Sequence, residues 1–104
     1  LVDVERERVE RVAAEVRALG RPAESLLGDA TSEVQVERVV DEAIKALGRI
    51  DNLVNIIGIA TWAPLLEVSS EAWDQQQLIN LKHHFLVSRS VARHSLAATF
   101  ASPG

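Results

Sequence analysis

The stretch "RIDNLVNIIGIA", residues 49–60, is an apolar run that begins at a turn and has a glycine near its end. Its β-branched and aliphatic residues at 50–57 predict a strand covered on both faces, as the strands of a parallel sheet are. Asn55 stands inside this run, where a polar amide is costly unless it finds hydrogen-bond partners. The stretch therefore predicts a buried strand that carries one asparagine for a structural or functional reason.

Two amphipathic helices are expected before this strand. Apolar side chains recur at helical spacing over residues 4–19, and Gly20 is placed to end that helix in a left-handed cap. The second helix is expected to follow Ser32, whose spacing to Gln35 fits a capping box, and to end at Gly48. Both patterns predict helices with one buried stripe and one solvated face.

A third, longer helix is expected after the strand, beginning at Ser69 or Ser70 and continuing to about residue 97. The short apolar segments 1–3 and 23–27 are interpreted as strands. The order is then strand, helix, strand, helix, strand, helix. This alternation predicts an α/β fold in which a parallel sheet is connected by right-handed crossovers.

Length and charge restrict the class of protein. The 104 residues suffice for one small domain, expected to span residues 1–104. The net charge is −4 and no basic block occurs, which argues against nucleic acid and anionic membranes as partners. No apolar run reaches the roughly 18 residues of a membrane-spanning helix. There is no cysteine, so thiolate metal sites are excluded and the composition fits a reducing, cytoplasmic location.

Polar residues follow the predicted strands at the end where open parallel sheets bind ligands. Asp3 follows the first strand, Asp29 the second, and Asn55 and Gly58 belong to the third. The first acid can accept hydrogen bonds from a ribose, the second can hold an adenine edge, and the glycine allows close approach of a ligand. Each has a structural alternative: Asp3 can favour a helix N-terminus, Asp29 can form a turn, and Asn55 can pair with neighbouring backbone.

The histidines and tryptophans are interpreted structurally. His83 and His84 are adjacent, so they face about 100° apart on a helix and do not converge on one metal, and His94 is far along the chain. We expect no metal site and assign all three to surface or interface packing. Trp62 and Trp73 flank the loop after the third strand and are expected to pack in the core rather than form a substrate wall.

Three segments resemble the middle of a short-chain dehydrogenase/reductase: "LVDVERERVERVAAEVRALG", "GDATSEVQVERVVDEAIKALGRIDNLVNIIGIA" and "SSEAWDQQQLINLKHHFLVSRSVARH". The resemblance covers nearly all of residues 1–96. It implies a partial Rossmann-like, doubly wound parallel sheet that lacks the first strand and the C-terminal strands. It also implies an NAD(P)-dependent oxidoreductase that acts on a ketone or a secondary alcohol.

The resemblance assigns roles to individual residues. Asp3 matches the acid that pairs with the adenosine ribose and favours NAD. Asp29, with Ala30 beside it, matches the acid that contacts the adenine amino group. Asn55 opens the motif usually written N-N-A-G, which ties the strands together beneath the cofactor. Asn80 in "INLK" matches the catalytic asparagine, which holds a water in the proton relay.

The chain departs from the family at several positions. Ile56 and Ile57 replace the second Asn and the Ala of the motif, which adds bulk where small-to-large changes cost ~1–3 kcal/mol. The glycine-rich TGxxxGxG turn and the catalytic Tyr-x-x-x-Lys pair are not found, and the sequence has no tyrosine. Since that tyrosine is the family's general acid/base, turnover by these residues alone is not expected.

The missing first strand also affects the sheet. In the strand order 3-2-1-4 it would lie between segments 1–3 and 23–27 on one side and segment 50–57 on the other, leaving a gap of roughly 10 Å. Re-pairing, a borrowed strand or further residues would have to fill it. Two functions stay open: the central segment of an oxidoreductase, or a non-catalytic α/β remnant that serves as an assembly or binding module.

The third helix is apolar over more than one stripe, which predicts burial on two sides. Leu78, Leu81 and Phe85 contribute to this surface. In the family the helix pairs with its copy in a neighbouring subunit. We therefore expect a homo-oligomer that forms through these residues.

Overall fold

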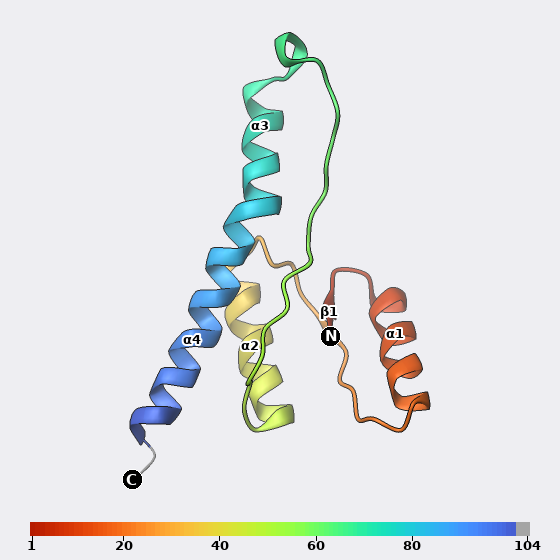
Figure 1. Ribbon diagram of the computed structural model, residues 1–104, viewed down its shortest axis with the longest axis vertical. Helices are drawn as coiled ribbons and strands as arrows, with labels where there is room; N and C mark the ends of the chain where they lie inside the picture. Colours follow the sequence, from red (N-terminus) through yellow and green to blue (C-terminus); the bar gives the residue numbers. More distant parts are fainter. Residues whose placement is uncertain (102–104) are drawn as a thin grey trace.

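The computed structural model describes the chain from residue 1 to residue 101 (Figure 1). Two short strands lie near the N-terminus, and helices make up most of the rest. In chain order the elements are β1 (Val2–Asp3), α1 (Arg6–Ala18), β2 (Leu26–Leu27), α2 (Glu33–Leu47), η1 (Leu65–Glu67), α3 (Ser70–Gln77), η2 (Leu78–Lys82) and α4 (His83–Ala101).

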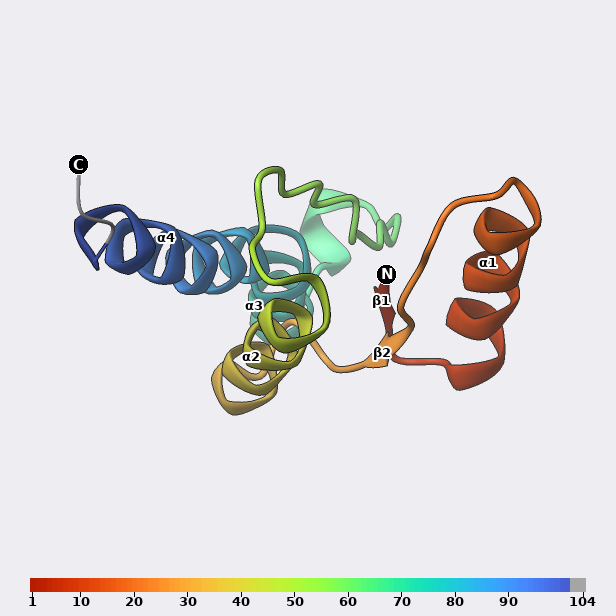
Figure 2. The ribbon, with the colours of Figure 1, turned by 90° about the horizontal axis from the view of Figure 1, so that it is seen from below.

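The two strands form a parallel pair in which Val2 is opposite Leu26 and Asp3 is opposite Leu27. The backbone N–H of Gly28 extends the pairing by donating to the carbonyl oxygen of Asp3 at 3.1 Å. Helix α1 lies on one side of this pair, and α2, α3 and α4 lie on the other (Figure 2). The fold is therefore α/β with a small parallel sheet, as the alternation of elements predicts.

The predicted third strand is not formed among the described residues. Residues 50–57 have no secondary structure, and the sheet contains only β1 and β2. In Figure 1 this segment is an extended trace that leaves α2 and runs toward α3. The β-branched composition favours an extended backbone, but a strand also needs a hydrogen-bonded neighbour. No described segment occupies the place beside it, so the extended chain stays unpaired.

The largest buried cluster joins α2 to α4. Val36 and Val40 of α2 pack with Leu86 of α4, and partly buried apolar residues surround them: Ala30, Ile44, Ile50, Val87 and Val91. Helix α1 buries Val9 and Ala13 separately. The apolar stripes expected for the first two helices therefore supply the buried residues of α1 and α2.

Both tryptophans are exposed, so the expectation that they pack in the core is wrong. Trp62 is 95% exposed and Trp73 is 60% exposed. The chain measures 57 × 36 × 19 Å, and the loop with η1 and α3 forms one elongated end of it (Figure 1). No second layer covers that end among the described residues.

The helix ends follow the sequence signals. Ser32 and Ser69 are the N-caps of α2 and α3, and their hydroxyl groups accept hydrogen bonds from the backbone N–H groups of Gln35 and Ala72. Gly48 caps α2 with φ at 83°, a value that favours glycine. Ser69, not Ser70, is therefore the residue that starts the third helical stretch.

The third helical stretch is continuous from Ser70 to Ala101, a few residues beyond the expected end. Its middle is the π-helical turn η2, where one extra residue is inserted into the turn. Such turns are often found at functional sites. Within residues 1–101, no helix is long and apolar enough to cross a membrane.

Candidate functional site

Asp3 and Asp29 lie at the same edge of the sheet, at the carboxyl ends of neighbouring parallel strands. Asp3 is the last residue of β1, and Asp29 follows β2 by two residues. The hydrogen bond from the Gly28 N–H to the Asp3 carbonyl oxygen fixes the two strand ends beside each other. The sequence pattern predicted this placement, because the carboxyl ends of parallel strands meet at one edge.

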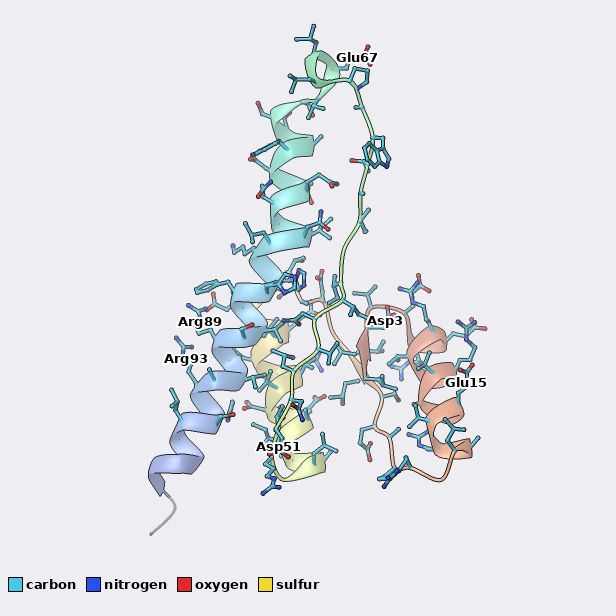
Figure 3. The ribbon with its side chains drawn as sticks, in the orientation of Figure 1. Asp3, Glu15, Asp51, Glu67, Arg89 and Arg93 are labelled. Atoms are coloured by element: carbon cyan, nitrogen blue, oxygen red, sulfur yellow. The ribbon has the colours of Figure 1, made fainter. Side chains whose placement is uncertain are left out.

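The Asp3 carboxylate is held by Arg8, in the first turn of α1. Arg8 Nε donates to Oδ2 at 2.6 Å and Arg8 Nη2 donates to Oδ1 at 2.7 Å, a bidentate pair. The backbone N–H of Glu5 donates to Oδ1 at 3.1 Å. The Arg8 guanidinium, with help from the Glu5 N–H, holds the pKa of Asp3 well below its usual range. Figure 3 shows Asp3 beside the start of α1.

The sequence pattern does not identify Arg8 as a site residue, because it lies in a run of Glu and Arg that is typical of a solvated helix face. Its contact with Asp3 crosses the turn between β1 and α1 and does not follow helical spacing. The signal that could have found it is the bidentate geometry available to an arginine shortly after a strand-end acid.

Asp29 is oriented by its own loop. Its Oδ1 accepts from the Thr31 hydroxyl at 2.6 Å and from the Thr31 N–H at 2.9 Å, and the hydroxyl contact is the first cause of a lowered pKa for Asp29. The Asp29 N–H donates to Oε1 of Gln35 at 2.9 Å. Gln35 therefore does not complete the expected capping box with its side chain. The described residues give Asp29 Oδ2 no donor, so this oxygen is available to a ligand.

Asn80 lies in η2 and holds the loop after the extended segment. Its Oδ1 accepts from the Ile59 N–H at 2.8 Å, and its Nδ2 donates to the Ile59 carbonyl oxygen at 2.8 Å and to Gln76 Oε1 at 3.2 Å. A Cβ on Gly58 would stand 3.0 Å from Asn80 Oδ1, so glycine permits this close approach. The amide thus pairs with the Ile59 backbone as an adjacent strand would.

The other predicted site residues are placed less tightly. Asn55 is half-buried in the extended segment, and the described residues supply no hydrogen-bond partner for its amide. Ala30 is half-buried against the α2–α4 cluster. Ile56 is 88% exposed and Ile57 is 42% exposed. The structure therefore groups Asp3 with Asp29, and Gly58 with Asn80, while Asn55 is joined to neither group by a hydrogen bond.

His83 is fully buried within the chain, which contradicts its assignment to surface or interface packing. Its Nδ1 donates to the Ile79 carbonyl oxygen at 2.5 Å, while its Nε2 has no hydrogen-bond partner among the described residues. His84 is exposed, and His94 lies 3.1 Å from Asp41. Within residues 1–101, no group of three or more His, Asp or Glu side chains is arranged to hold a metal.

The parallel strands, the flanking helices and the polar strand ends define a Rossmann-like α/β domain. A family model described as short chain dehydrogenase matches residues 1–101, and the chain belongs to this family. It is 34% identical over 95 residues to a short-chain dehydrogenase/reductase, eriH, of Hericium erinaceus, and 36% identical over 91 residues to a cyclopentanol dehydrogenase of a Comamonas species. These alignments cover 91% and 88% of this chain.

Solved structures show the same fold. A gluconate 5-dehydrogenase of Burkholderia cenocepacia, in complex with NADP and tartrate, superposes with a TM-score of 0.85 and 33% identity, covering 94% of this chain. The chain spans 38% of that protein, and 38% and 36% of the two relatives above. The described residues therefore correspond to somewhat more than a third of each of these proteins.

The residues present fit the adenosine end of a dinucleotide. Two acids follow neighbouring strands at the carboxyl edge of the sheet, and among the described residues Asp29 Oδ2 has no donor, so it can accept from an amino group. Asp3 retains an open acceptor position on Oδ2, because a carboxylate offers about four and three are filled here. The second group, Asn80 with the Ile59 backbone, fixes the loop that follows Gly58.

Proposed function

We propose that the chain is the central segment of an NAD(P)-dependent oxidoreductase that converts a ketone to a secondary alcohol or the reverse. The family and its dehydrogenase relatives support the reaction class. The observation that carries the proposal is that Asp3 and Asp29 follow neighbouring parallel strands at one sheet edge, with Asp29 Oδ2 left open. When bound, the nicotinamide cofactor supplies the hydride transfer.

The residues of this chain would bind and orient that cofactor. Asp29 would accept from the adenine amino group, since Thr31 and Gln35 fix its orientation from the other side. Asp3 would accept from the adenosine ribose, which favours NAD, the cofactor inferred from this acid. Asn80 would keep the loop after Gly58 in place by its two bonds to the Ile59 backbone. Ala30 and Asn55 belong to the same proposed cofactor surface.

We do not expect these residues alone to catalyse the reaction, because a carbonyl oxygen has no tyrosine here to donate its proton. Without a pyrophosphate-binding turn, saturable NADH binding below about millimolar is not expected either.

The test is to titrate an 11.4 kDa polypeptide, verified by intact mass, with NADH and to assay alcohol oxidation. Tight binding with turnover would contradict the inactivity. A coding region without a glycine-rich turn upstream and a Tyr-x-x-x-Lys pair downstream would count against the segment assignment.

The alternative function, an assembly module, is favoured by one observation. Leu81 and Phe85 are 62% and 57% exposed on the face of the long helix that was expected to meet a second copy, while Leu78 is half-buried. We propose homo-oligomerisation through this face for either function. A cytoplasmic location, inferred from the composition, belongs to the same proposal.

A further inference from the structure

The π-turn η2 changes which neighbours the residues of the long helix face. Each residue of a regular α-helix adds about 100° of rotation, so an extra residue in one turn rotates the two ends of the helix against each other. With this turn in place, Asn80 pairs with the Ile59 backbone while Leu86 packs against Val36 and Val40 of α2. A contact that stabilises the π-turn therefore also fixes the direction of Asn80.

The His83 side chain makes such a contact. Its Nδ1 donates to the Ile79 carbonyl oxygen at 2.5 Å. In a regular α-helix this carbonyl would accept from the backbone N–H of residue 83, whereas the backbone bonds of a π-turn reach one residue further. The imidazole of the same residue thus supplies a donor where the turn departs from the α-helical pattern. The Ile79 carbonyl belongs to the peptide group that joins Ile79 to Asn80, so the ring is bonded directly beside that amide.

The burial of His83 points to Nδ1 as the group that matters. The side chain is fully buried, and its Nε2 has no hydrogen-bond partner among the described residues. A buried nitrogen without a partner is unfavourable, and an apolar side chain of similar size would avoid that cost. Because Nδ1 is the donor, the neutral ring carries its proton on Nδ1 and not on Nε2.

We propose that His83 is a positioning residue that locks the π-turn η2 and, through it, holds Asn80 against the Ile59 backbone. Its importance for a reaction rests on the proposed function, in which Asn80 keeps the loop after Gly58 in place. The contact itself is a property of the folded chain, so it is measured without a cofactor.

Hydrogen exchange of the ¹⁵N-labelled chain tests the coupling. His83→Leu fills the buried position but has no donor. We therefore expect the Ile59 amide to exchange about 10-fold faster in this variant, while the amides of α2 change by less than about 3-fold. His84→Leu is the matched control, because His84 is exposed and its ring centroid lies 4.0 Å from that of His83. A general disturbance of packing around the ring would appear in both variants, but we expect His84→Leu to change the Ile59 exchange by less than about 2-fold.

A double substitution tests whether His83 acts through Asn80. In a chain that already carries Asn80→Asp, adding His83→Leu should speed the Ile59 exchange by less than about 3-fold, because both changes weaken the same contact. A further increase of about 10-fold would mean that the two residues act independently and would overturn the proposal.

The ring ¹⁵N shifts of His83 give a readout that a purely structural role would not fix. At neutral pH we expect a protonated Nδ1 and an unprotonated Nε2. Equal acceleration of exchange at Ile59 and in α2, or unchanged exchange at Ile59 in His83→Leu, would overturn the proposal. Should His83→Leu not fold, the ring of the wild-type chain decides, and a ring without a proton on Nδ1 overturns it. None of these outcomes involves cofactor binding, so the NADH titration tests the proposed function separately.

Discussion

Asp3 and Asp29 both lie at the carboxyl ends of strands, yet their carboxylates are held in different ways. Asp3 is bound by a charged partner from the following helix, whereas Asp29 is bound by the neutral Thr31 of its own loop. In both cases the hydrogen bonds favour the ionised form, so the pKa of each acid lies below its ordinary value. The first acid is therefore electrically neutralised and the second keeps its negative charge.

The lowered pKa of both acids predicts a pH dependence of folding. A lowered pKa means that the folded chain binds fewer protons than the unfolded chain, so both acids stabilise the fold above about pH 4, and this stabilisation is lost progressively as the pH falls below that value toward the folded-state pKa. Arg8→Gln should reduce the loss of stability between pH 7 and pH 3, because Asp3 then titrates nearer its ordinary pKa. Denaturant unfolding at the two pH values measures the difference, and Arg6→Gln is the control. Equal losses in both variants would contradict the assignment.

A second prediction at the residue scale concerns Asn80, whose amide both donates to and accepts from the Ile59 backbone. Asn80→Asp keeps the acceptor but loses the donor, so the Ile59 carbonyl oxygen would face a carboxylate. We expect a local cost of about 1–2 kcal/mol, seen as a roughly 5- to 30-fold faster exchange of the Ile59 amide hydrogen. The exposed Gln77 provides the control Gln77→Glu, which should leave that exchange rate unchanged.

At the scale of elements, α2 and α4 are joined by more than their apolar stripes. Acidic residues recur at four-residue spacing on α2 and contact hydrogen-bond donors on α4. Two of these donors, Arg89 and Arg93, lie one turn apart (Figure 3). The contacts are Arg89–Glu33 at 2.5 Å, Ser90–Glu37 at 3.1 Å, Arg93–Glu37 at 3.8 Å and His94–Asp41 at 3.1 Å. Exposed ion pairs contribute little singly, so we expect the buried member, Ser90, to matter most.

Ser90 is fully buried and its hydroxyl donates to Glu37 Oε2 at 3.1 Å. Ser90→Ala should therefore lower the free energy of unfolding by about 1 kcal/mol, which corresponds to a decrease in melting temperature of roughly 4–8 °C for a domain of this size. Ser88→Ala, at an exposed position of the same helix, should change the melting temperature much less. Equal effects of the two substitutions would show that the bond to Glu37 adds nothing.

The helices and their caps could be predicted from the sequence because their signals are local. The stripe that includes Val36 and Val40, the Ser32 cap and the Gly48 cap all depend on residues within a few positions of each other. The same is true of the strand-end placement of Asp3 and Asp29. The Asp3–Arg8 pair and the burial of His83 depend on how separate elements meet, and single-sequence patterns do not contain that information.

At the scale of the whole molecule, the long helix presents apolar residues that the chain itself does not cover. Leu81 and Phe85 are exposed, and Arg89 lies over the Phe85 ring, 4.5 Å from its centroid. We predict an oligomer at tens of micromolar that the double substitution Leu81→Glu and Phe85→Glu converts to a monomer, since burying two charges is costly. Leu96→Glu, also at an exposed leucine of α4, is the control. Sedimentation of the wild-type chain as a stable monomer would contradict the prediction.

Segment 50–57 is unpaired because, among the described residues, no strand of the sheet lies beside it. Its residues have strand composition, but composition alone does not supply the neighbouring backbone that a strand requires. We therefore predict that the amides of residues 53–57 exchange within about 10-fold of the rates of unstructured peptides, while those of α2 exchange at least about 100-fold more slowly. Ile59 is an internal control, because its N–H is bonded to Asn80 and should be protected in the wild-type chain and roughly 5- to 30-fold less so in Asn80→Asp. Protection of residues 53–57 as strong as that of α2 would mean that this segment has found a partner strand in solution.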